Sequence, residues 1–257
     1  MHILVTNDDG VLAPGLLALA QAVRPFGKIS VLAPDHNWSI SGHSKTLHRP
    51  LRVKEARLAD GTPALASDGA PSDCVALALL GLLEEPVDFV VSGINPFPNL
   101  GHDLTYSGTV TAAMEASIWG LPAIAFSLDR PDNGPIDIDF STAVQVIQTV
   151  MRKTLHYGLP KNHLLNVNIP YLPKEEIKGY RITRQGLRIY HDVLVRREDP
   201  QGVPYYWIGG DAPSGVPDEN TDIGELAAGY VSITPIQLDL TAHYLLKELQ
   251  GWDWSAG

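Results

Sequence analysis

The residues best suited to chemistry in this chain are two adjacent carboxylates near its start. Asp8 and Asp9 directly follow residues 3–6, an apolar run that predicts a buried strand. Taking two neighbouring carboxylates out of water costs free energy unless a positive group lies between them. Because ligands of open α/β sheets bind at the carboxyl ends of strands, the pair is a candidate cation or catalytic site. A polar turn is the alternative interpretation, since Asn, Asp and Gly are common turn residues.

Further polar residues lie in loops that follow predicted strands, or at the start of a predicted helix. Ser39 comes after a strand at residues 29–34, and two asparagines follow a strand at residues 87–93. The carboxyl ends of parallel strands meet at one edge of a sheet, so we expect these loops to converge. The complete candidate set is Asp8, Asp9, Ser39, Asn95, Asn99, Ser107, Gly108 and Thr109.

The oxygen-rich character of this set favours a hard divalent cation such as Mg²⁺, Mn²⁺ or Ca²⁺. The chain has one cysteine and no histidine pair with the HExxH spacing of a zinc site. Residues 107–109 predict a helix start, where backbone N–H groups and the helix dipole bind phosphate. A helix N-cap is the simpler interpretation of Ser107 alone. A cation beside a phosphate cradle indicates phosphoryl chemistry.

Other polar and aromatic residues flank the predicted site. His43 and His102 are candidates for proton transfer or binding, although loop histidines are more often solvated. Trp38 either stacks on a base or covers its own loop. The acidic loop at residues 132–139 predicts a solvated face.

The elements that must position these residues alternate between strands and helices. A helix at residues 14–23 separates the first two predicted strands, which defines a βαβ unit and a parallel sheet. The predicted fold class is α/β, a Rossmann-like doubly wound and mostly parallel sheet. The GxGxxG fingerprint of dinucleotide-binding proteins is absent. The alternation continues through helices at 71–83, 107–119 and 141–156, and strands at 87–93, 123–127 and 164–169.

The pattern changes after residue 170. Strands at residues 180–183 and 203–208 flank a polar segment and predict an extended, projecting β-hairpin with an aromatic partner surface. A strand at residues 230–235 precedes a last helix at residues 241–249. We expect the aromatic tail that follows, with Trp252 and Trp254, to dock on another subunit.

The length of 257 residues and the apolar fraction of 44% fit one large α/β domain, 1–257. The chain contains no run of about 18 apolar residues, so we expect no transmembrane helix. The parts we expect are a Rossmann-like core at 1–170, a hairpin at 178–210, and a C-terminal helix and tail for oligomer contacts at 236–257.

Charge and cysteine content narrow the partners and the setting. The net charge of −10 argues against binding a nucleic-acid polymer, whereas a bound metal ion would still allow a single nucleotide. The lone cysteine, Cys74, cannot form an internal disulfide. The first residues lack the basic and apolar regions of a signal peptide. We therefore expect a cytoplasmic protein.

Several motifs are specific enough to indicate a family. They are Asn7-Asp8-Asp9-Gly10, Ala13-Pro14-Gly15, Ala33-Pro34-Asp35, Ser92-Gly93-Ile94-Asn95, Asn99-Leu100-Gly101, Tyr106-Ser107-Gly108-Thr109-Val110 and Gly229-Tyr230-Val231-Ser232-Ile233-Thr234-Pro235. In this order, and over nearly the whole chain, they resemble the SurE family of survival nucleotidases.

The resemblance implies a metal-dependent phosphatase that hydrolyses nucleoside 5′-monophosphates, with Asp8 and Asp9 as its catalytic residues. It implies one divalent cation per subunit, Mg²⁺ or Mn²⁺, and a homodimer or homotetramer with an exchanged C-terminal helix. By motif position, the metal ligands would be Asp8, Asp9, Ser39 and Asn95. The phosphate site would be lined by Asn99, Ser107, Gly108 and Thr109.

Three positions depart from the family pattern. Ile40 and Phe97 stand where a small residue and a glycine are usual, and Ala70 replaces a threonine. These changes leave the predicted metal ligands intact and bear on base preference and pocket shape.

Several functional alternatives stay open at this stage. One is a non-catalytic nucleotide sensor, and another is an aspartyl-phosphate transferase of the haloacid-dehalogenase type, which uses DxD spacing rather than adjacent acids. The sequence does not decide whether a metal-activated water or Asp8 is the nucleophile. Action on 3′-nucleotides or polyphosphate is equally undecided.

Overall fold

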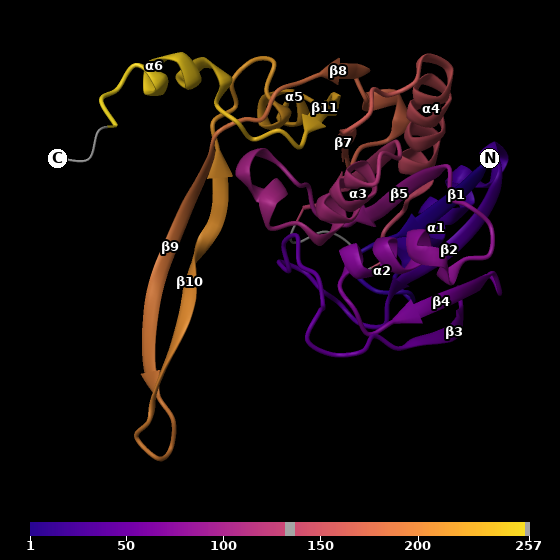
Figure 1. The fold of residues 1–257 in the computed structure, drawn as a ribbon, viewed down its shortest axis with the longest axis horizontal. Helices are drawn as coiled ribbons and strands as arrows, with labels where there is room; N and C mark the ends of the chain where they lie inside the picture. Colours follow the sequence, from indigo (N-terminus) through magenta and orange to yellow (C-terminus); the bar gives the residue numbers. More distant parts are fainter. Residues whose placement is uncertain (132–136, 255–257) are drawn as a thin grey trace.

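The structure is a computed structural model that describes residues 1–131 and 137–254. Residues 132–136 of the predicted acidic loop lie outside the described part. At the centre of the described chain is a nine-stranded sheet in the order β3-β4-β2-β1-β5-β6-β7-β11-β8 (Figure 1). Its strands are β1 (His2–Thr6), β2 (Lys28–Pro34), β3 (Val53–Arg57), β4 (Pro63–Ser67), β5 (Phe89–Asn95), β6 (Ala123–Asp129), β7 (His163–Pro170), β8 (Tyr180–Ile182) and β11 (Val231–Gln237).

Strands β4, β2, β1, β5, β6 and β7 run parallel, and β3 and β11 pair antiparallel with β4 and β7. The predicted α/β class with a mostly parallel sheet is therefore confirmed. The helical elements are α1 (Pro14–Val23), η1 (Arg24–Phe26), α2 (Pro71–Leu77), η2 (Ala78–Leu82), η3 (Gly101–Thr105), α3 (Gly108–Ile118), α4 (Ser141–Tyr157), η4 (Lys174–Glu176), α5 (Asp222–Ala227), η5 (His243–Leu245) and α6 (Leu246–Gln250).

Helices cover both faces of the sheet. Ile3 and Val5 of β1 pack with apolar residues of α1 and α4, whereas Leu4 packs on the opposite face with α2 and α3. This alternation follows from the two-residue period of a strand, which turns successive side chains to opposite faces. Because both faces are buried, the central strands are almost wholly apolar, and the fold is doubly wound.

The chain reverses its direction of winding between β1 and β5. From β1 it passes to β2 on one side, and β5 later pairs with β1 on the other side. Thr6, the last residue of β1, pairs with Ser92 of β5 at the switch point, and sheets of this kind bind ligands beyond the carboxyl ends of the strands there. The start of α1 closes this crevice: a Cβ on Gly15 would lie 2.2 Å from the carbonyl oxygen of Ile94, an approach that only glycine allows.

The projecting hairpin consists of β9 (Arg188–Glu198) and β10 (Pro204–Gly215), which extend away from the sheet (Figure 1). The prediction that residues 180–183 form one of its strands is wrong. Tyr180–Ile182 instead pairs in parallel with β11 at the edge of the main sheet. The charged segment 188–198 forms the hairpin strand because a two-stranded ribbon buries neither face, so charged residues are compatible with it.

The C-terminal segment, η5 and α6, lies away from the sheet (Figure 1). A helical segment was predicted here, and the structure divides it into a 3₁₀ turn and a short α-helix. The rings of Trp252 and Trp254 stack with centroids 5.7 Å apart and are exposed. Exchange of this segment between subunits stays a prediction. No helix among the described residues is long and apolar enough to cross a membrane.

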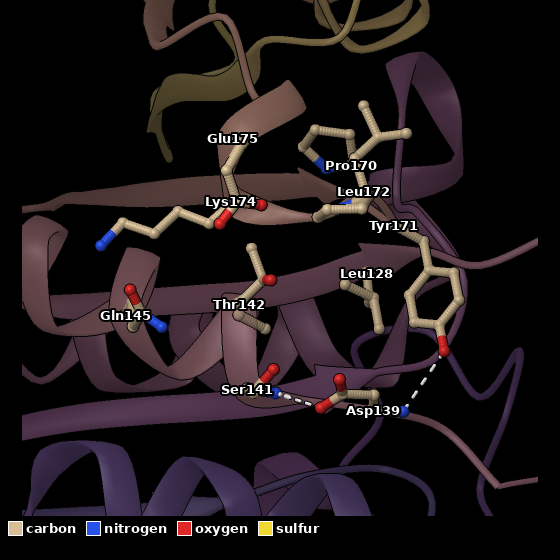
Figure 2. A pocket seen from close by; sticks show the side chains of 12 residues that line it. Leu128, Asp139, Ser141, Thr142, Gln145, Pro170, Tyr171, Leu172, Lys174 and Glu175 are labelled. Carbon is tan, nitrogen blue, oxygen red and sulfur yellow. Dashed lines mark hydrogen bonds between the residues drawn. The ribbon is translucent and has the colours of Figure 1, made fainter.

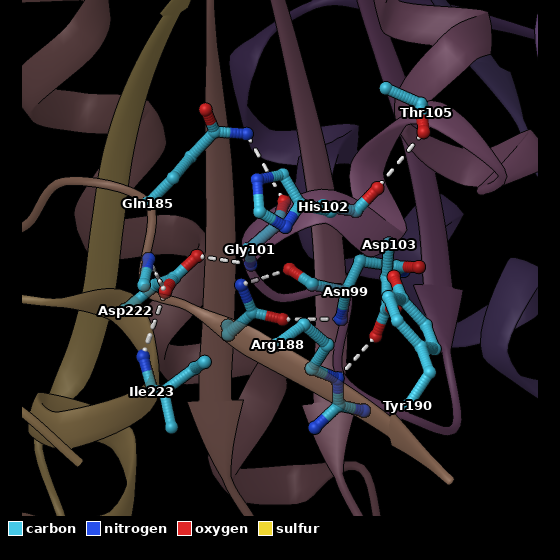
Figure 3. A network of polar contacts seen from close by, with 12 residues as sticks. Asn99, Gly101, His102, Asp103, Thr105, Gln185, Arg188, Tyr190, Asp222 and Ile223 are labelled. Atoms are coloured by element: carbon cyan, nitrogen blue, oxygen red, sulfur yellow. Dashed lines mark hydrogen bonds and ion pairs between the residues drawn. The ribbon is translucent and has the colours of Figure 1, made fainter. Parts of the chain in front are cut away.

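A buried carboxylate joins the base of the hairpin to the loop after β5. Asp222 is fully buried and accepts hydrogen bonds from the backbone N–H groups of Gly101 (2.8 Å), Gly186 (2.7 Å) and Ile223 (2.8 Å) (Figure 3). Beside it, Arg188 of β9 forms an ion pair of 2.6 Å with Asp103 of η3. The hairpin base and the η3 loop are therefore fixed relative to one another.

We expect Asp222→Ala to lower the free energy of unfolding by about 3 kcal/mol, because three buried N–H groups lose their acceptor. Chemical denaturation monitored by circular dichroism measures this loss. The matched control is Glu84→Ala, an exposed acid in a loop, which we expect to stay within about 0.5 kcal/mol of the wild type. Equal stabilities of the two variants would contradict the anchoring role of Asp222.

Candidate active site

The carboxylate of Asp8 is enclosed between the end of β1 and the N-terminus of α3. Its side chain is only 4% exposed, and its Oδ1 accepts a hydrogen bond from the hydroxyl of Thr109. A Cβ on Gly108 would lie 2.7 Å from the Cβ of Asp8 and 3.0 Å from its Oδ2. Glycine at the first position of α3 therefore lets the acid pack directly on the helix backbone, where the helix dipole favours negative charge.

The environment of the two acids raises their pKa values. Burial raises the pKa of Asp8, although hydrogen bonds from Thr109 partly oppose the effect. Burial and the neighbouring charge of Asp8 raise the pKa of Asp9 from 3.8 to about 7. Ionising both carboxylates at neutral pH is therefore costly unless a cation lies between them. The donor set fits a hard divalent cation on this ground.

The loop after β2 lies against both acids, as predicted. The backbone N–H of Trp38 donates to the backbone carbonyl of Asp8 over 2.8 Å. The side-chain amide of Asn37 lies 3.5 Å from Oδ1 of Asp9, and its oxygen accepts from the N–H of Ser39. The contacts of Trp38 and Asn37 show that these two loops converge, and Ser39 is exposed in the second of them.

A buried acid on α3, Glu115, anchors the rest of that loop. Its carboxylate contacts His43 (2.9 Å), Lys45 (2.6 Å) and the indole N–H of Trp119 (2.9 Å). Burial alone would raise the pKa of Glu115, but these hydrogen bonds outweigh it and lower the pKa to about 2. His43 thus faces a structural partner, and our sequence reasoning missed Glu115 although it is the one acid in a helix of small and apolar residues.

Asn95 ends β5, three residues beyond Ser92, which pairs with Thr6 at the end of β1. Its side-chain amide donates to the carbonyl of Phe97, which folds the loop back on itself. β1 and β5 are neighbours in the sheet, so Asn95 lies at the end of the strand beside the one that precedes the acids.

Asn99 is held in a buried network of amides. Its side-chain nitrogen donates to Ser127 Oγ (2.7 Å), and its backbone N–H donates to Asn168 Oδ1 (2.8 Å). Its carbonyl accepts from the side chains of Asn166 and Asn168, each at 2.9 Å (Figure 3 shows part of this network). The sequence signal for this network was available but missed: two amides alternate on one face of an otherwise apolar strand.

At the start of α3, the hydroxyl of Ser107 accepts a hydrogen bond of 3.1 Å from the N–H of Val110. Ser107 is therefore an N-cap, while its hydroxyl proton is available to a second acceptor. The hydroxyl of Thr109 instead donates to Asp8. Of the two, Thr109 orients the acid, and Ser107 lies at the helix end where an anion would bind.

The described residues contain no cluster of three or more His, Cys, Asp or Glu side chains that could hold a metal ion. A metal site at the acid pair therefore depends on two carboxylates and neutral oxygens.

A cavity of about 630 Å³ lies at the start of α4, lined by Asp139, Ser141 and Tyr171 among others (Figure 2). Its described lining includes none of the predicted site residues.

The geometry defines a doubly wound α/β protein with paired acids and a helix N-terminus at its switch point. A family model described as survival protein SurE matches residues 3–192. The chain therefore belongs to the SurE family, as its motifs predicted.

Three relatives illustrate the similarity. The chain is 50% identical over 254 residues to the 5′-nucleotidase SurE of Chloroflexus aggregans, covering 99% of this chain and 100% of the relative. It is 51% identical over 255 residues to the 5′-nucleotidase SurE of Herpetosiphon aurantiacus, covering 99% of each. The crystal structure of the SurE protein from Aquifex aeolicus superposes with a TM-score of 0.81 at 41% identity, covering 97% of this chain and 98% of that one.

We expect the stability of the metal-free protein to depend on pH through Asp9. Its folded pKa of about 7 exceeds the ordinary 3.8, so the stability it contributes is complete below pH 3.8 and is lost as the pH rises through 7. In EDTA, Asp9→Asn should therefore gain stability over the wild type across this window, on the order of 3 kcal/mol. Melting curves at pH 4 to 8 measure the difference, and parallel profiles for the two proteins would contradict it.

Proposed function

We propose that this chain is a divalent-metal-dependent phosphatase that hydrolyses nucleoside 5′-monophosphates to nucleoside and phosphate. The observation that carries the proposal is the acid pair at the end of β1, in which Asp8 is held against the N-terminus of α3 and both acids have raised pKa values. The relatives named 5′-nucleotidase SurE support the same reaction, because they match the chain over its whole length.

One Mg²⁺ or Mn²⁺ per subunit would be held by Asp8, Asp9, Ser39 and Asn95. When bound, such an ion polarises a phosphoryl oxygen and lowers the pKa of a coordinated water. The support lies in the chemistry of the donors, two carboxylates, a hydroxyl and an amide oxygen, on three neighbouring loops.

The chain's own groups would bind and orient the phosphate. The hydroxyl of Ser107 and the backbone N–H of Gly108 would donate hydrogen bonds to the phosphate, and the positive end of the α3 dipole would favour its negative charge. Thr109 acts through Asp8, since its hydroxyl donates to that carboxylate. Asn99, which Asn166, Asn168 and Ser127 hold in place, would line the phosphate site.

The nucleophile that attacks phosphorus is either water or Asp8. Water is favoured because Oδ1 of Asp8 already accepts from Thr109 and the carboxylate would also hold the metal ion. In either case the bond between phosphorus and the nucleoside oxygen breaks. Acid quenching of a single turnover traps a phosphorylated protein only if Asp8 attacks, which distinguishes the two routes.

A homodimer or homotetramer is supported by the exposed apolar residues of the hairpin. Leu194, Trp207 and Ile208 are exposed there, as are Trp252 and Trp254 of the tail. The C-terminal helix would be exchanged between subunits. The cytoplasm is the proposed setting, supported by the single, buried cysteine Cys74.

Phosphate release from a panel of 5′- and 3′-mononucleotides and polyphosphate, with and without Mg²⁺ or Mn²⁺, tests the function. We expect release from 5′-monophosphates only with metal. Asp8→Asn and Asp9→Asn should each lower kcat by about 10²- to 10³-fold, whereas the exposed control Glu84→Gln should not. Tight nucleotide binding without release would identify a sensor instead, and full activity in either acid variant would remove the acid pair from the chemistry.

A further inference from the structure

The aromatic ring of Phe97 is exposed beside the proposed site and takes no part in the proposed metal and phosphate contacts. Phe97 stands in the loop between Asn95 and Asn99, and its side chain is 41% exposed. Its backbone carbonyl accepts a hydrogen bond from the side chain of Asn95, so the position of the ring is tied to a proposed metal ligand.

The side chain of Arg130 covers part of this ring. Its guanidinium carbon lies 5.2 Å from the ring centroid, within the range of a cation–π contact. The contact follows from the sheet, because Asn95 of β5 pairs with Ser127 of β6 and both loops continue from there. Phe97 and Arg130 therefore lie against one another on the loops that follow β5 and β6.

From these contacts, we infer that Phe97, supported by Arg130, is the surface on which the nucleobase of the substrate stacks. The inference deepens the proposed nucleotidase function and rests on it. Neighbouring strands lie about 4.8 Å apart, so the loops after β5 and β6 lie one and two strand spacings from the acids of β1. The ribose of a nucleotide bridges a separation of this order between its phosphate and its base.

Trp38 also lies near the acids, and it is less suited to this role. Its ring already packs beside that of His36, with centroids 5.2 Å apart, and its indole nitrogen is buried. Phe97 in contrast keeps much of its ring open to solvent. Stacking on an aromatic face grows with the area of the base, so purine nucleotides are the preferred substrate class.

Steady-state kinetics with AMP, UMP and ribose 5-phosphate test the stacking surface, because ribose 5-phosphate keeps the phosphate and lacks the base. Phe97→Gly and Phe97→Leu should raise the KM for AMP about tenfold, UMP less, and leave ribose 5-phosphate within about twofold. Phe97→Trp should restore the wild-type KM for AMP. Tyr157→Ala is the matched control, an exposed ring under Lys153 at the far end of α4, and should change nothing.

Two results would overturn the inference: an unchanged KM for AMP in Phe97→Gly, or an equal rise for AMP and ribose 5-phosphate. A wild type that releases no phosphate from any substrate would reject the proposed function separately. Equilibrium binding of AMP and ribose 5-phosphate by calorimetry then decides the inference. An AMP-specific loss of affinity in Phe97→Gly supports the stacking surface, and equal affinities in wild type and variant reject it.

Discussion

The enclosure of the Asp8 carboxylate by the first turn of α3 is the interaction on which the site depends. Gly108 allows the helix backbone to approach the acid, and the Thr109 hydroxyl fixes its orientation. Together with Asp9 this creates a place where negative charge is concentrated and poorly solvated. Ionised carboxylates are unfavourable in such a place by themselves, and a bound cation would compensate for their charge.

The remainder of the fold holds separate loops at this point. The switch between β1 and β5 brings the acids and Asn95 to adjacent strand ends. Glu115 holds the loop that carries Ser39 against the same helix that encloses Asp8. Asp222 ties the η3 loop to the hairpin base, so the hairpin is connected directly to the loop between the asparagine network and α3.

Much of this arrangement could be predicted from the sequence, because it depends on local signals. Apolar runs with polar ends gave the parallel strands, and strand–helix alternation gave the doubly wound order. The residues that the sequence analysis missed form hydrogen bonds with partners far away in the sequence. These pairs are Glu115 with His43, Asn168 with Asn99, and Asp222 with Gly101. Residues 180–183 were misassigned for a related reason, since a three-residue strand has no period of its own and its partner, β11, lies about fifty residues further along the chain.

Anomalous diffraction from crystals grown with Mn²⁺ near neutral pH tests the shared cation most directly. The predicted result is one manganese peak at roughly 2.0–2.6 Å from oxygens of Asp8 and Asp9, with Ser39 and Asn95 directly or through water on the same ion. A fully occupied peak elsewhere with none at the acids, or a peak that Ser39 and Asn95 cannot reach, would contradict a site built by convergence of these loops.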